Sequence, residues 1–153
     1  MTPKVNRMPD EDPFLEFAGS NVVEADARHA VAQQCPAPEL DNHAGVRHAG
    51  ALFTVGYAAS RALVAAALES KAESAKAQMV DSEIAYEKLV SGELVTASAE
   101  PAGDDWESLL ARISDGEAVK LPTSVTLRNE EGKTVTAMTV CWQVTPPGGD
   151  GSR

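Results

Sequence analysis

The chain has 153 residues, a length that suits one domain with a sizeable core. Apolar residues make up 43% and charged residues 24%, so the composition is globular rather than disordered. The formal net charge of −10 argues against a nucleic-acid surface and against a basic patch for anionic lipid, since both need clustered Lys and Arg. Two cysteines, Cys35 and Cys141, fit no metal-binding spacing; with no recognisable signal peptide, they indicate a reducing, cytoplasmic setting.

The first third of the chain predicts a short helix followed by strands. Residues Pro9–Ala18 place acidic residues ahead of a cluster of aromatic and aliphatic ones, which indicates a short helix that Gly19 ends. Valines and alanines are interleaved through Asn21–Gln34, a pattern that fits one or two strands. Two prolines make Cys35–Asn42 a loop.

A long, nearly uncharged helix follows, starting near Ala49 and running through Leu68, with Arg61 as its only charge. A helix that is apolar on all sides is buried, either in a protein core or in a membrane. The length is close to the roughly 20 residues that a membrane span needs. Polar interruptions and flanks without basic or aromatic anchors favour a central helix wrapped by protein, and no membrane partner is expected.

The second half changes to the period-two pattern of strands, with one amphipathic helical insert. The predicted elements are a strand at Met79–Tyr86, a strand at Glu93–Ala99, a helix at Asp104–Ser114 capped by Asp104 or Asp105, a strand at Val119–Leu127 and a strand at Thr134–Val144. The last two strands are joined by a hairpin turn at Asn129–Gly132.

This order predicts an α+β fold in which an antiparallel sheet wraps around one long helix. The expected division is an N-terminal segment with a short helix at residues 1–19, one domain at 20–145 and a flexible tail at 146–153. Such a sheet has edge strands that must be covered or paired. Pairing between two copies would solve this, so we expect a homodimer or a dimer of dimers.

A sequence pattern at the start of the long helix resembles that of a known family. The residues Asn42, Gly45, His48, Gly50 and Phe53 fit N-x-x-G-x-x-H-[AG]-G-x-x-F. This pattern resembles the hot-dog-fold thioesterase superfamily, especially its single-domain phenylacetate-pathway and 4-hydroxybenzoyl-CoA thioesterase-like members. Three later segments, at 84–86, 92–94 and 127–133, look like strands and a hairpin of the same family, so the resemblance covers roughly residues 20–145.

The resemblance implies a hot-dog fold and a site for an acyl thioester, with coenzyme A or phosphopantetheine as part of the substrate and no separate cofactor or metal. In the family the pantetheine arm lies in a tunnel at the dimer interface, and the thioester carbonyl sits at the N-terminal end of the central helix. There the amide of Ala49 or Gly50 could donate to a developing oxyanion, because the first amides of a helix have no intrahelical partner. Asn42 and His48 could orient the carbonyl or a water.

The chain departs from the family at the position nine residues after the histidine. The family usually carries Asp or Glu there, as nucleophile or general base, whereas this chain carries Tyr57. A tyrosine with a pKa near 10 is a poor base at neutral pH. Tyr57 could instead donate a hydrogen bond, act as an acid or simply pack in the core. Many relatives also carry Ser or Thr early in the next strand, where Met79 stands here, or Ser82 if the alignment shifts by a few residues.

Three further residues are candidate ligand contacts. Asp41 could supply a replacement base, and His43 is either a site residue or a surface residue. Arg61 lies one turn beyond Tyr57, where it could bind an acidic group of the ligand or pair with an acid such as Asp81 or Glu83.

Three hypotheses about function follow. The first is an enzyme that hydrolyses acyl-CoA or acyl-carrier-protein thioesters. The second keeps the fold and changes the chemistry to dehydration, isomerisation or cyclisation. The third is a non-catalytic dimer that binds an acyl ligand or a partner.

Overall fold

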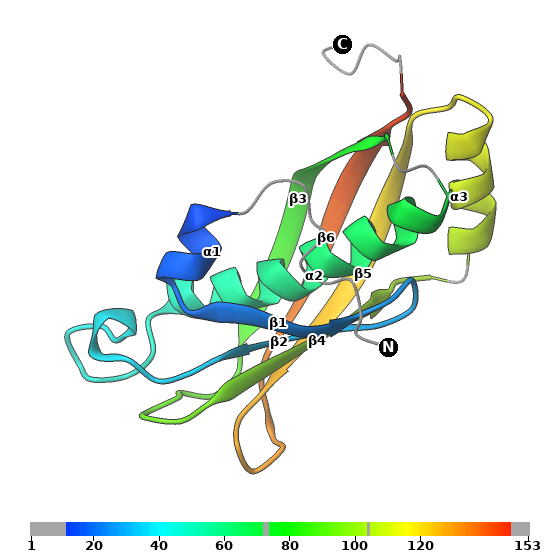
Figure 1. The fold of residues 1–153 in the computed structure, drawn as a ribbon. Coiled ribbons are helices and arrows are strands. Elements are labelled where there is room, and N and C mark those ends of the chain that lie inside the picture. Colours follow the sequence, from blue (N-terminus) through cyan, green and yellow to red (C-terminus); the bar gives the residue numbers. More distant parts are fainter. Residues whose placement is uncertain (1–11, 72–73, 104, 148–153) are drawn as a thin grey trace.

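The computed structural model describes residues 12–71, 74–103 and 105–147 and shows a curved antiparallel sheet around one long helix (Figure 1). The helices are α1 (Pro13–Phe17), the short 3-10 helix η2 (Pro38–Leu40), α2 (Ala49–Lys71) and α3 (Trp106–Ser114). The strands are β1 (Ser20–Ala25), β2 (Ala30–Gln34), β3 (Lys76–Tyr86), β4 (Val95–Pro101), β5 (Val119–Arg128) and β6 (Thr134–Thr145). The predicted α+β architecture is therefore confirmed.

The six strands lie in the order β1-β2-β4-β5-β6-β3, and every neighbouring pair is antiparallel. The strands β1 and β3 form the two edges of this sheet. Figure 1 shows the sheet curving around α2, with β1 and β2 on one side of the helix and β3 on the other. The loop before α2, the β3–β4 loop and the β5–β6 hairpin gather at one end of the molecule (Figure 1).

Small side chains let α2 lie close to the sheet. Alanines such as Ala58, Ala59 and Ala62 are buried, together with Leu63. At Gly56 a Cβ atom would stand only 2.3 Å from the Met138 sulfur, so only glycine fits there without movement. The helix is long and apolar enough to cross a membrane, but most of it is buried inside the protein, as expected for a core helix.

The central strands alternate as the sequence predicts. Inward positions on β4 and β5 are buried and outward positions are partly exposed. The inward residues that complete the core against α2 include Val95, Ala97, Ala99, Leu121, Val125, Leu127, Val135 and Val140. Because one sheet face packs on the helix and the other meets solvent, the period-two pattern was a reliable guide.

A buried polar network crosses this core. The Trp142 indole N–H donates to the Ser60 hydroxyl at 2.8 Å, and the Ser60 and Thr123 hydroxyl oxygens lie 2.6 Å apart. The Thr123 hydroxyl in turn donates to the Val140 carbonyl at 2.9 Å. All of these side chains are at least 97% buried, and each hydroxyl has its hydrogen-bonding partners inside the core. The network ties α2 to β5 and β6.

Several element boundaries differ from the prediction. The strand β4 begins at Val95 rather than Glu93, because the Glu93 carboxylate and carbonyl are both engaged in turn contacts. The predicted loop after Cys35 contains the 3-10 turn η2. Asp105 stands at the N-cap of α3 without a side-chain capping bond. Both cysteines are free thiols, with Cys35 exposed. Most of the predicted tail, residues 148–153, and residues 1–11 lie outside the described residues.

Candidate functional site

The loop that leads into α2 is shaped by Asn42. Its side-chain oxygen accepts hydrogen bonds from the amides of Ala44 at 2.9 Å and Val46 at 3.3 Å. The main-chain N–H of Asn42 donates to the Val46 carbonyl at 2.8 Å. Gly45 takes the positive φ of 77° that closes the turn. The Asn42 oxygen is therefore engaged in the loop, and only the NH2 group of this side chain is left to orient a ligand.

His48 caps the start of α2. The Gly50 amide donates to its Nδ1 at 2.8 Å, and the His48 carbonyl accepts from the amides of Ala51 and Leu52 at 2.9 and 3.1 Å. Since Nδ1 is an acceptor, a neutral His48 ring carries its proton on Nε2. The ring is exposed at the helix start, so the Nε2–H group can meet a ligand.

This cap decides which amide is left to bind an oxyanion. The Gly50 amide, one of the two predicted donors, is engaged by His48. Among the hydrogen bonds of the described residues, none is donated by the Ala49 amide. Ala49 begins a helix of 23 residues, whose N-terminal dipole end is positive. The Ala49 amide is therefore the better candidate for polarising a carbonyl.

Two aromatic rings stack on that of Tyr57, one from α2 and one from β6. Its ring centroid lies 6.4 Å from that of Phe53 and 5.5 Å from that of Trp142, and both pairs are stacked. Burial raises the pKa of Tyr57; the nearby Arg61 charge acts against this shift, and Asp12 adds to it. The net shift is upward, so the phenol stays protonated at neutral pH. Tyr57 is suited to donate a hydrogen bond and is not a base.

The predicted site residues form two groups. The first group lies at or just before the helix start and comprises Asp41, Asn42, His43, His48 and Gly50. Tyr57 and Arg61 lie further along α2, on a partly exposed stripe with Phe53. At about 1.5 Å per residue, Tyr57 lies about 12 Å along the helix from Ala49. One chain therefore does not bring the two groups to the same ligand atom.

Asp41, His43 and Arg61 occupy different surroundings. Asp41 pairs with Arg47 through the backbone, and its charge acts on the Arg47 guanidinium. His43 is exposed in the loop. Arg61 is partly buried one turn beyond Tyr57, and its charge reaches the Tyr57 hydroxyl.

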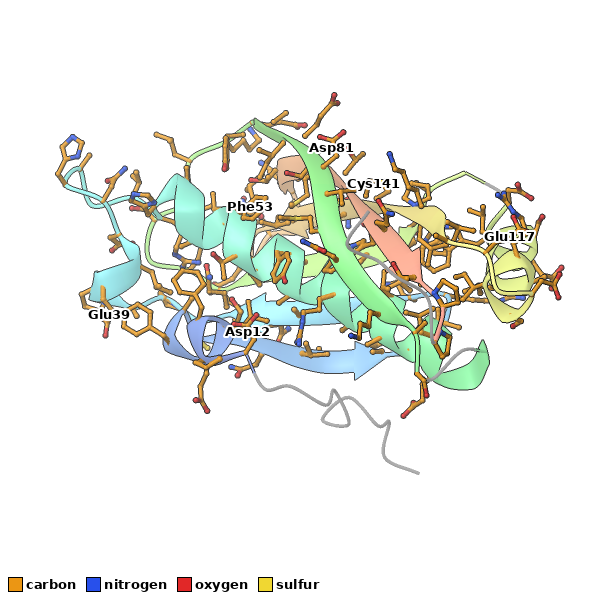
Figure 2. All side chains as sticks on the ribbon, turned by 90° about the horizontal axis from the view of Figure 1, so that it is seen from above. Asp12, Glu39, Phe53, Asp81, Glu117 and Cys141 are labelled. Carbon is orange, nitrogen blue, oxygen red and sulfur yellow. The ribbon has the colours of Figure 1, made fainter. Side chains whose placement is uncertain are left out.

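Four residues near the site were not predicted from the sequence. Asp12, which Figure 2 labels beside α1, caps that helix, and its charge acts on Tyr57. The Tyr86 hydroxyl donates to the Ala49 carbonyl at 3.1 Å. Arg47 and Gln34 are buried behind the helix start and hydrogen-bonded to each other. Spacing along the chain gives little sign of these contacts, because Asp12, Gln34 and Tyr86 come from other elements.

The described residues contain no group of three or more His, Cys, Asp or Glu side chains that could hold a metal ion. The residues named above can form hydrogen bonds and transfer protons at the positive end of a long helix.

A curved antiparallel sheet around one central helix is the hot-dog fold, and several solved structures share it with this chain. PaaI, from the phenylacetic acid degradation operon of Escherichia coli, is 16% identical with a TM-score of 0.71, over 94% of this chain and 91% of that one. A hypothetical thioesterase from Streptococcus pneumoniae, solved with coenzyme A, is 19% identical with a TM-score of 0.66, over 88% and 96%. AziG from S. sahachiroi is 18% identical with a TM-score of 0.73, over 88% and 98%.

The chain belongs to the family described as Domain of unknown function (DUF4442), whose model matches residues 8–144. A comparison with curated proteins finds none that matches. The predicted hot-dog resemblance is confirmed at the level of fold.

Proposed function

We propose that this protein is a thioesterase-like enzyme that acts on an acyl thioester of coenzyme A or of an acyl carrier protein. The observation that carries the proposal is the start of α2. There the Ala49 amide has no hydrogen-bond acceptor among the described residues, and the exposed His48 ring is held in place by the Gly50 amide. The coenzyme A bound to the Streptococcus pneumoniae neighbour agrees with a thioester ligand.

In the proposed reaction a water attacks the thioester carbonyl carbon. The Ala49 amide and the positive helix end stabilise the oxyanion that forms. The C–S bond then breaks, and the thiolate takes up a proton as it leaves. His48 Nε2–H orients the carbonyl or the water, and Tyr57 donates a hydrogen bond or a proton. The proton of the attacking water passes to a carboxylate, for which Asp41 or a group of a partner subunit is the candidate.

We propose a homodimer as the working unit, because about 12 Å of helix separates Tyr57 from Ala49 within one chain. A second copy could bring its own Tyr57 to the helix start. The edge strand β3 offers 11 residues for pairing, and the other edge strand, β1, has six. Val80 and Tyr86 on β3 are 46% and 47% exposed. Sedimentation should give a dimer that Val80→Lys weakens, since lysine on an edge strand opposes pairing; a monomeric wild-type protein would refute this assembly.

Burial, which raises the pKa of Tyr57, also supports a second candidate, a dimer that binds acyl-CoA without turning it over. A thiol-release assay over a panel of acyl-CoA and acyl-phosphopantetheine substrates separates the two, with calorimetric titration of the same ligands. Turnover that falls at least tenfold in Tyr57→Phe, with folding retained, supports the enzyme. Phe17→Ala, on the exposed face of α1, serves as the control and should leave turnover unchanged. Binding without turnover would refute the enzyme and support the binding dimer.

A further inference from the structure

A buried arginine lies directly behind the helix start. Arg47 is only 3% exposed, and burial lowers the pKa of its guanidinium, against the charges of Asp41 and Glu93. Its side-chain partners are the Gln34 amide oxygen and the Glu93 carbonyl, so within the described part of the chain no carboxylate oxygen accepts its hydrogen bonds. Its Nε atom is buried and finds no hydrogen-bond partner among the residues that the structure describes. Burying a cation in this way is costly, and apolar residues would fill the same space at lower cost.

The contacts of Arg47 join three segments of the chain. Its Nη1 donates to the Gln34 Oε1 at 2.8 Å, and its Nη2 donates to the Glu93 carbonyl. Its main-chain amide donates to the Val90 carbonyl at 2.7 Å, and the Ser91 hydroxyl donates to the Gly45 carbonyl at 3.1 Å. The loop before α2 is therefore fastened to the β3–β4 loop through both the side chain and the backbone.

Gln34 connects Arg47 to the first turn of α2. It is completely buried at the end of β2, and its Nε2 donates to the Ala51 carbonyl at 2.9 Å. The neighbouring carbonyls of Ala49 and Gly50 also accept side-chain hydrogen bonds, from Tyr86 at 3.1 Å and Thr54 at 2.7 Å. Hydrogen bonds in a chain polarise one another, so a peptide group whose carbonyl is bonded becomes a stronger N–H donor. Gln34 and Tyr86 therefore fix and polarise the first turn of α2 from outside the helix, and Thr54 adds a contact from the next turn.

We propose that Arg47 and Gln34 are positioning residues for the site at the start of α2. This inference rests on the proposed function: the two residues hold the His48 ring and the Ala49 amide at the place where a thioester carbonyl binds. Arg47 and His48 are adjacent in the loop but have different roles. Arg47 is buried and positions the loop, whereas His48 is exposed and can meet the ligand. Arg47 and Gln34 orient the groups that meet the ligand, and neither of them contacts the ligand itself.

Gln34→Glu is the sharpest test. It keeps an acceptor for Arg47 and adds an opposite charge, but it removes the Nε2 donor to the Ala51 carbonyl. We expect kcat to fall at least tenfold while KM changes less than threefold, and the NMR signals of the His48 ring and the Gly50 amide to shift. A variant with wild-type kcat and unchanged His48 and Gly50 signals would overturn the proposal.

A double variant, Gln34→Met with Arg47→Met, guards against a purely structural effect. Replacing both partners by apolar groups can leave stability nearly unchanged. We expect a melting temperature near that of the wild type, with kcat still reduced and the His48 signals still shifted. A double variant with wild-type melting temperature, wild-type kcat and wild-type His48 signals would show that the pair only stabilises the fold, and it would overturn the proposal. The matched control is Arg112→Met, which removes an exposed arginine of α3 that pairs with Glu117.

The NMR readout keeps the two proposals apart. If the wild-type protein turns over no thioester, the proposed function fails. The His48 and Gly50 signals then still report whether Gln34 and Arg47 fix the helix start.

Discussion

Replacing Gly56 by alanine tests how closely α2 is packed on the sheet. The new Cβ would lie 2.3 Å from the Met138 sulfur and 3.2 Å from the Leu127 Cδ1. Both neighbours are at least 97% buried, so the methionine has little room to move aside. Alanine is the better helix former, and this alone would stabilise the helix by about 1 kcal/mol. The two effects have opposite signs, so the sign of the measured change is informative.

The contact is expected to dominate. Inserting an atom into a well-packed core costs about 1–3 kcal/mol, and a 2.3 Å approach points to the upper part of that range. After subtracting the gain in helix propensity, Gly56→Ala should lower the free energy of unfolding by about 2 kcal/mol. For a protein of this length, the melting temperature should fall by about 4–8 °C.

Urea denaturation followed by circular dichroism measures this change, with two controls. Ala66→Gly, at a partly exposed position of the same helix, gives the propensity effect by itself. Adding Met138→Val to Gly56→Ala removes the sulfur, so the double variant should lose less stability than the sum of the two single variants. A Gly56→Ala protein as stable as the wild type, or more stable, would refute the close packing of α2.

Three further predictions concern single side chains. Ser60→Ala leaves the Trp142 indole N–H buried without its acceptor and should cost about 1–3 kcal/mol in urea denaturation; an unchanged midpoint would argue against the network. Burial raises the pKa of both Tyr57 and Tyr86, so the folded state holds these protons more tightly than the unfolded state. Their contribution to stability is complete below the unfolded pKa of about 10 and is lost as the pH rises through their folded pKa values, so Tyr57→Phe should flatten the fall in stability that sets in above about pH 10. Glu130→Ala removes the carboxylate that accepts from the Leu94 amide at 2.8 Å, so hydrogen exchange at Leu94 should quicken while global stability changes little.

The fold was predictable because its signals are local. The alternation of β4 to β6 and the uncharged run of α2 each reflect burial of one face or of the whole element, so the pattern survives in the sequence. The boundary at Glu93 was missed because its turn depends on contacts with Arg47 and with the Glu130 amide, which come from distant segments. The 3-10 turn at Pro38–Leu40 was missed because it is a single short turn inside a proline-rich loop.

The site was predictable only in part. The sequence pattern indicated the helix start with Asn42 and His48. It did not show that the Gly50 amide is engaged by the His48 ring, because that depends on the rotamer of one side chain. Gln34 could not have been connected to this site from spacing, since it reaches Ala51 from a different strand. Whether the predicted residues act on a ligand stays a prediction.

The position of β3 has a consequence for how the chain folds. This strand follows α2 directly but pairs with β6 at the far end of the sequence, as in the match of Lys76 with Thr145. During synthesis β3 therefore emerges well before its partner and has to wait for the last strand. Pairings between distant segments form slowly and leave hydrogen-bonding edges open in the meantime. We expect closure of the sheet by β3 and β6 to be a late step, and a nascent chain that lacks β6 to expose β3 to aggregation.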